Sequence, residues 1–155
     1  MTFKDELVEI LKAELESLKS IKKLSYEKTD VIIKNQVEEL DKITKKEVEL
    51  INQMASLEQA RLNLLNTWGV DKNTTLSQII DRIPDGKEDL IELADEIKAN
   101  MEEIQARNNM NNELIRDNLE WIEFNINMIT QAAVPTTYDK KKDGKMGQSL
   151  FDRKV

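Results

Sequence analysis

Clusters of acidic side chains are the first residues of this chain that could do chemistry. One cluster is Glu38, Glu39 and Asp41, and another is Asp89, Glu92, Asp95 and Glu96. Paired carboxylates can act as acid and base in glycoside hydrolysis. Here they stand beside Lys at helical spacing, and no glycine-rich loop lies near them to shift their pKa. We therefore interpret both clusters as solvated helix faces.

The residue types that most other enzyme chemistry needs are missing. The sequence has no Cys and no His, which removes thiolate and imidazole nucleophiles, the commonest general base, and every metal site built on those ligands. It also has no glycine motif that could hold a phosphate. We predict that the protein is not an enzyme and uses no cofactor or metal.

The last long helical stretch, 85–133, has an apolar arc that widens halfway along. At about 100° per residue, its first half keeps its apolar residues within about 100° of one another, the width that one neighbouring surface requires. These residues are Leu90, Leu93, Ala94, Ile97, Met101 and Ile104. From Leu114 onward the arc spans roughly 220° on the same wheel.

The wider arc consists of two apolar stripes, with Asn118 and Asn125 between them. We expect the first stripe to continue the core: Ile115, Leu119, Ile122, Ile126 and Ile129. The second stripe is Leu114, Trp121, Phe124 and Met128. Either another part of the chain covers it, or it forms one wall of a groove for an amphipathic helix of a partner.

Four asparagines, Asn108, Asn111, Asn118 and Asn125, lie on or beside the inward side of this helix. Buried Asn lowers stability but specifies register and partner in helical assemblies. The alternative is that these residues occupy the wet edge of a bundle. Both interpretations are open at this point.

Composition and charge limit the possible partners. The 155 residues are 34% charged, contain 4 Gly and 2 Pro, and fit one helical domain. The net charge of -7 disfavours nucleic acid. No apolar run is long enough for a membrane span, and the first residues do not resemble a signal peptide, so we expect a cytoplasmic protein.

Residues 134–155 differ from the rest in charge. They hold six basic and three acidic residues, a net +3, which leaves -10 for residues 1–133. We expect this tail to be flexible and solvated, or to contact the acidic body or a partner. Because it also carries isolated hydrophobes such as Tyr138, we include Tyr138 among the candidate partner-binding residues.

Capping patterns place the helices of the first half. Helix one is expected from about Thr2 to Ile33, followed by a tight turn at Lys34 and Asn35 in which Asn35 caps helix two and Glu38 reaches back. Helix two then extends from about Gln36 to Trp68, ended by a left-handed Gly69. The competing reading is one unbroken helix of about 65 residues. The residues expected to face inward in these two helices are Leu7, Ile10, Leu11, Leu18, Ile21, Ile32, Val37, Leu40, Leu50, Met54, Leu57, Leu64 and Trp68.

The second half predicts one short and one long helix. The segment 75–78 forms a capping box for a short helix to Arg82, and 83–86 reads as a turn. Asp85 and Glu88 are expected to cap the long helix, which ends before Pro135. The predicted fold is all-α: an elongated antiparallel bundle of three long helices plus one short helix over residues 1–133, with a flexible C-terminal tail over 134–155.

The chain as a whole resembles the FlgN family of flagellar export chaperones. The segments that carry the resemblance are Lys34 to Leu40, Leu57 to Leu65, Thr75-Leu76 leading to Ile83-Pro84, Asn111 to Ile115, and the tail with Tyr138, Gly144 and Phe151 to Val155. None of these segments is specific alone, but their order and spacing together are.

The resemblance implies a cytoplasmic chaperone that binds the C-terminal helical segment of flagellar hook-filament junction proteins through its own C-terminal region. It would prevent premature assembly and deliver this cargo to the flagellar type III export apparatus, as a monomer or weak homodimer. The partner-binding residues we predict are Leu114, Asn118, Trp121, Phe124, Asn125, Met128 and Tyr138. The alternative function is a self-associating coiled-coil scaffold or adaptor.

Overall fold

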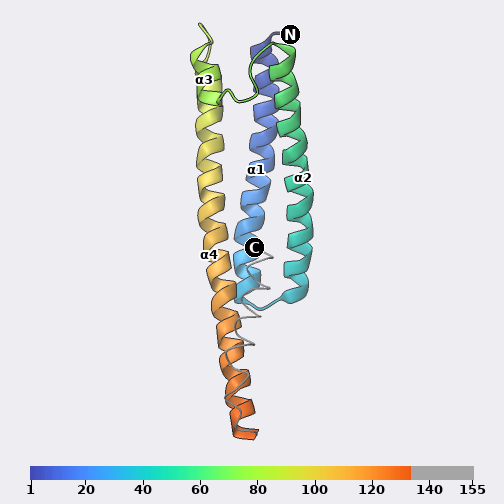
Figure 1. The fold of residues 1–155 in the computed structure, drawn as a ribbon, viewed down its shortest axis with the longest axis vertical. Coiled ribbons are helices and arrows are strands. Elements are labelled where there is room, and N and C mark those ends of the chain that lie inside the picture. Colours follow the sequence, from blue (N-terminus) through green and yellow to red (C-terminus); the bar gives the residue numbers. More distant parts are fainter. Residues whose placement is uncertain (134–155) are drawn as a thin grey trace. The chain divides into compact units, whose positions relative to one another are not determined.

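A computed structural model of the chain describes the backbone of residues 1–133 and the side chains of residues 1–130. This part contains four helices and no strand: α1 (Phe3–Ile33), α2 (Val37–Thr67), α3 (Leu76–Asp81) and α4 (Glu88–Ala133) (Figure 1). The all-α prediction with three long helices and one short helix is confirmed. The predicted flexible tail, 134–155, lies outside the described residues.

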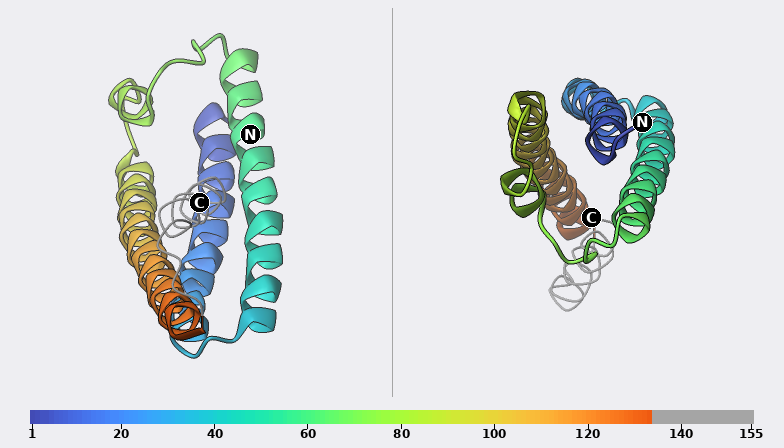
Figure 2. Two further views of the ribbon diagram at one scale, coloured as in Figure 1. Left: turned by 60° about the horizontal axis from the view of Figure 1, so that its bottom comes forward. Right: turned by 90° about the horizontal axis from the view of Figure 1, so that it is seen from above.

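By internal contacts the chain divides into two units, 1–108 and 109–155. Within the first unit, α1 lies beside both α2 and the first part of α4, as the view from above shows (Figure 2). The second unit, in its described part, is a single stretch of α4. The predicted boundary at residue 133 is not tested by this division and stays a prediction.

The turn between α1 and α2 rules out one unbroken helix. The Asn35 N–H donates to the Ile32 carbonyl and the Gln36 N–H to the Val31 carbonyl, both at 3.1 Å, and Asn35 has a φ of 54°. This is the pairing of a Schellman motif, in which a left-handed residue ends the helix. The expected capping role of Asn35 is therefore wrong: Asn35 closes α1, while α2 begins after Gln36, whose side chain makes no cap bond.

The other helix ends follow the sequence pattern more closely. Gly69 is left-handed with a φ of 69° and closes α2 as predicted. Thr75 and Gln78 form the expected capping box, with bonds of 3.2 and 3.0 Å. The predicted start of α4 at Asp85 is wrong, because the left-handed Gly86 delays the first helical residue to Glu88.

The apolar core of the first unit joins all four helices near the α3 end. Its buried members are Leu7, Leu11, Leu15, Leu18, Leu64, Leu65, Ile79, Ile80, Leu90, Leu93 and Ile97. The short helix α3 belongs to it because its capping box holds Ile79 and Ile80 in place against the long helices. The expected inward residues that this core confirms are Leu7, Leu11, Leu18, Leu64, Leu90, Leu93 and Ile97.

In the first unit, three of the expected inward residues are exposed instead: Val37, Trp68 and Met101. Val37 is the first residue of α2, directly after the turn, and Trp68 is the residue that caps the same helix. Helix ends have fewer neighbours than helix centres. Trp68 keeps one contact, an edge-to-face packing on Phe3 with ring centroids 5.7 Å apart.

Met101 is exposed because the buried face of α4 follows a seven-residue repeat. Leu90, Ile97 and Asn111 recur at multiples of seven and are buried, as are Leu93 and Asn100. Asn100 lies seven residues after Leu93 and so continues this repeat, whereas Met101 lies beside it and faces outward.

Away from α3, polar contacts in the first unit accompany the buried apolar residues Leu24, Ile32 and Ile43. Ser25 is fully buried; its hydroxyl lies 3.0 Å from the Ile21 carbonyl and 3.3 Å from the Asn108 side-chain oxygen. The Arg107 guanidinium packs 3.8 Å above the Tyr26 ring. Lys28 pairs with Glu47 at 3.3 Å between α1 and α2. Such polar contacts stabilise a helix interface less than apolar burial does.

Candidate functional site: an exposed apolar surface on α4

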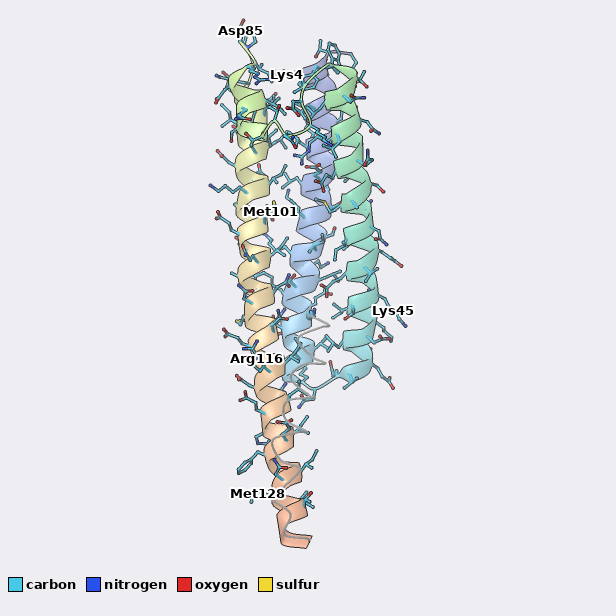
Figure 3. The ribbon with its side chains drawn as sticks, in the orientation of Figure 1. Lys4, Lys45, Asp85, Met101, Arg116 and Met128 are labelled. Carbon is cyan, nitrogen blue, oxygen red and sulfur yellow. The ribbon has the colours of Figure 1, made fainter. Side chains whose placement is uncertain are left out.

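The described part of the second unit, residues 109–130, carries the densest run of exposed large apolar side chains. Trp121 is 67% exposed and Phe124 is 62% exposed. Large exposed apolar patches on a protein surface mark sites of interaction. We call Leu114, Trp121, Phe124 and Met128 the aromatic stripe (Met128 is labelled in Figure 3).

The structure separates the predicted site residues by exposure. Trp121, Phe124 and Met128 are exposed, whereas Leu114, Asn118 and Asn125 are partly buried. The Asn125 side-chain NH₂ donates to the Trp121 carbonyl at 2.8 Å, so part of this amide's hydrogen bonding is met within the helix. Tyr138 lies outside the described residues, and its role stays a prediction.

The isoleucine stripe, Ile115, Leu119, Ile122, Ile126 and Ile129, is not the core that we expected. Ile122 is 46% exposed, and Leu119, Ile126 and Ile129 are exposed as well, while only Ile115 is partly buried. The physical reason lies in the second unit itself, whose described residues form one helix. An apolar stripe is buried only where another element packs on it, and within the described residues 119–130 no side chain is buried.

An asparagine column separates the two stripes: Asn111, Asn118 and Asn125, spaced by seven residues. It continues the line of Leu90, Ile97 and Ile104 along α4. Asn111 is 1% exposed, and Asn108, one turn before it, meets Ser25. Of the two interpretations left open, the buried one fits Asn111, whereas Asn108 is partly buried.

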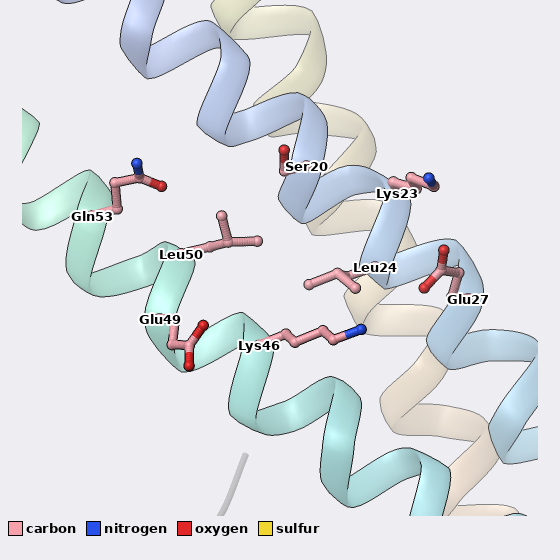
Figure 4. Close-up of a pocket in the computed structure, with 8 residues that line it drawn as sticks. All are labelled: Ser20, Lys23, Leu24, Glu27, Lys46, Glu49, Leu50 and Gln53. Carbon is pink, nitrogen blue, oxygen red and sulfur yellow. The ribbon is translucent and has the colours of Figure 1, made fainter.

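A second concave surface lies between α1 and α2, with a volume of about 520 Å³. Leu24 and Leu50 point toward each other across it (Figure 4), while Lys23, Glu27, Lys46 and Glu49 line its rim. Its two positive and two negative charges balance, so it selects no charged ligand. Among the described residues no three Asp or Glu side chains gather as a metal site would require.

One buried carboxylate of the first unit, Glu14, has a shifted pKa. Burial raises the pKa of Glu14; Arg61 opposes this shift and Glu58 adds to it. Glu14 is 4% exposed and lies 3.8 Å from Arg61. Because Glu14 lies in the interface between α1 and α2 and lines no cavity described here, we interpret its shift as structural.

A family model described as FlgN protein matches residues 1–145. The chain belongs to the FlgN family. Members of this family are flagellar export chaperones and not enzymes. The resemblance noted from the sequence is therefore confirmed over nearly the whole chain. No curated protein and no solved structure matches this FlgN-family chain significantly.

None of the helices described for this FlgN-family chain is long and apolar enough to cross a membrane. The family model extends beyond residue 130 and so includes all of the exposed stripes on α4. Sequence reasoning found the aromatic stripe but assigned the isoleucine stripe to the core. A helical wheel reports which residues share a face, and it carries no signal of what covers that face.

Proposed function

We propose that this protein is a cytoplasmic export chaperone that binds the C-terminal helical segment of flagellar hook-filament junction proteins on residues 114–129 of α4. The observation that supports this proposal is the exposure of the aromatic stripe, above all of Trp121 and Phe124. An amphipathic cargo helix would bury these side chains, and aromatic anchors of this kind dominate helix recognition.

Binding there would keep the cargo segment from assembling early and would leave the chaperone–cargo complex available to the export apparatus. The remaining proposed contacts are Leu114, Asn118, Asn125, Met128 and Tyr138. Met128 suits such a surface because its unbranched side chain adapts to different partners. The asparagines would limit nonspecific association while no cargo is bound.

The test is a calorimetric titration of the full chain with the C-terminal segment of the junction protein from the same cell. Replacing Trp121 or Phe124 by Ala should weaken binding about 30-fold or more, as loss of a hot-spot aromatic does. Met128→Ala should weaken binding less. Its matched control is Met101→Ala, since the two methionines are 54% and 56% exposed on the same helix. Unchanged binding in the Trp121 and Phe124 variants would place the cargo site elsewhere.

The alternative, a self-associating scaffold, draws support from the asparagine column. Asn at one position of a seven-residue repeat specifies register when helices of this type pair with themselves. A scaffold should sediment as a tight dimer that Trp121→Ala dissociates. A chaperone should sediment as a monomer or weak dimer until cargo is added.

A further inference from the structure

The two exposed stripes of α4 differ in the charge along their outer edges. Glu113, Asp117 and Glu120 lie eleven, seven and four residues before Phe124. This places all three on the side of the aromatic stripe away from the asparagine column, with Asp117 within about 20° of Phe124 itself. All three carboxylates are exposed. Within the described residues, none of the three forms an ion pair with another side chain.

The outer edge of the isoleucine stripe is neutral by comparison. It carries Asn112, Arg116 and Glu123, whose charges cancel (Arg116 is labelled in Figure 3). Arg116 is also the single cation in the sequence 109–130. The segment therefore presents two apolar stripes of similar size. The aromatic stripe is bordered by three negative charges, and the isoleucine stripe is bordered by residues whose net charge is zero.

Rim charges of this kind affect selectivity and association more than total affinity. An exposed ion pair contributes little to binding by itself. A row of like charges beside an apolar stripe nevertheless favours partners with the opposite row and disfavours partners with the same row. The acidic edge can thus determine which amphipathic helix binds, and in which rotation about its axis.

We propose that the aromatic stripe binds an amphipathic helix with a row of Lys or Arg along one edge, and that Glu113, Asp117 and Glu120 face that row. This proposal rests on the proposed function and specifies the chemistry of the cargo helix. The aromatic stripe supplies apolar burial, and the acidic edge supplies the preference among apolar helices.

Two synthetic helical peptides test the proposal. Both carry the same leucine stripe over three heptads, and one edge is lined with Lys in the first peptide and with Glu in the second. The sequence contains two tryptophans, Trp68 and Trp121. In the Trp68→Phe variant of the full chain Trp121 remains, and its fluorescence reports binding at the aromatic stripe. Trp121→Ala in otherwise wild-type chain, titrated by calorimetry, should lose binding of both peptides.

At low salt the Lys-edged peptide should bind about tenfold more tightly than the Glu-edged peptide, the preference that three exposed ion pairs of usual size provide. The preference should shrink at about 1 M salt, where charges beyond roughly 3 Å are screened. Replacing Glu113, Asp117 and Glu120 together by Lys should reverse it. The matched control replaces Glu92, Asp95 and Glu96 by Lys; they are exposed on the same helix, and the net charge changes equally.

The outcomes separate this proposal from the proposed function. Equal binding of both peptides, or a preference that the two triple variants change equally, overturns the acidic-edge proposal while the cargo site stands. If neither the peptides nor the junction-protein segment alters Trp121 fluorescence, the proposed function at this site fails and the edge proposal fails with it. A tight dimer of the free chain that buries Trp121 overturns the edge proposal in favour of a second copy as occupant. Circular dichroism of each variant should match the parent, because every replaced side chain is exposed.

Discussion

The Glu14 carboxylate is buried between α1 and α2, and Arg61 is its ion-pair partner. Burial raises its pKa, and Arg61 at 3.8 Å offsets this effect in part. A buried charge is unfavourable unless it is well paired. The folded state therefore holds the Glu14 proton more readily than the unfolded state does. The stability linked to Glu14 is fully present below its unfolded pKa and is lost as the pH rises through its folded pKa.

Glu14→Gln should consequently stabilise the protein at neutral pH, because it removes the buried charge and keeps the shape of the side chain. The gain over wild type should shrink as the pH falls toward about 3, where Glu14 is protonated in both folded and unfolded chains. Urea melts of the two proteins across this pH range measure the difference. A variant less stable than wild type at pH 7 would show that the Arg61 pair outweighs the cost of burial.

The exposed apolar residues of α4 should contribute little to folding. Trp121→Ala and Ile122→Ala should each change the free energy of unfolding by within about 0.5 kcal/mol, since both side chains face solvent. Leu11→Ala is the contrast, because Leu11 is 0% exposed and its loss should cost about 2–5 kcal/mol through a cavity. Denaturant melts of the three variants measure these changes in the free energy of unfolding. A large loss in Ile122→Ala would restore the isoleucine stripe to the core.

At the scale of elements, the turn between α1 and α2 depends on one left-handed residue. Asn35 has a φ of 54°, a region that Gly enters freely, Asn tolerates and β-branched residues avoid. Asn35→Gly should leave stability unchanged or slightly higher, whereas Asn35→Val should cost about 1–2 kcal/mol. Thermal melts measure both variants. An Asn35→Val protein as stable as wild type would mean that the Schellman pairing does not hold this turn.

Helix identities and most helix ends could be predicted because their signals are local. The Thr75 and Gln78 side chains and the left-handed Gly69 act within a few residues of the end that they define. Asn35 was placed at the correct turn but given the wrong role, since Asn suits both an N-cap and a left-handed C-terminal position. Only the paired bonds of Asn35 and Gln36 to α1 distinguish the two roles.

At the scale of the whole molecule, burial was less predictable, because it depends on which surfaces meet. The wheel grouped the apolar residues of α4 into two stripes, but it assigned the isoleucine stripe to the core although most of its residues are exposed. The wheel could not reveal that the buried residues of α4 include Asn111 together with Leu90 and Ile97, while Met101 is exposed. The choice between neighbouring positions such as Asn100 and Met101 depends on which helices pack against α4, and it decides which side chains remain available to a partner. The aromatic stripe was predicted to be a partner surface from its position on the wheel; three of its four residues are exposed, and its binding role stays a prediction.

The uneven burial along α4 predicts uneven local stability in the free protein. Residues 88–100 include four buried side chains, Leu90, Leu93, Ile97 and Asn100. Residues 119–130 include none, by the same measure. Helical backbone that lacks apolar packing opens at low free energy, because packing provides most of a helix's stability in proteins. Hydrogen exchange of the full chain should therefore be fast at 119–130 and slow at 88–100.

Cargo binding should then slow exchange at residues 119–130 far more than at 88–100, since a bound helix would supply the missing packing and would stabilise only the state in which this segment is helical. One partner helix covers about 100° of arc, and the two stripes span roughly 220°. A cargo segment that contributes two helices should protect the segment more strongly than a single-helix peptide of equal affinity for the aromatic stripe. Exchange followed by mass spectrometry with each ligand makes this comparison. Equal protection by both ligands would mean that one stripe remains exposed in the complex.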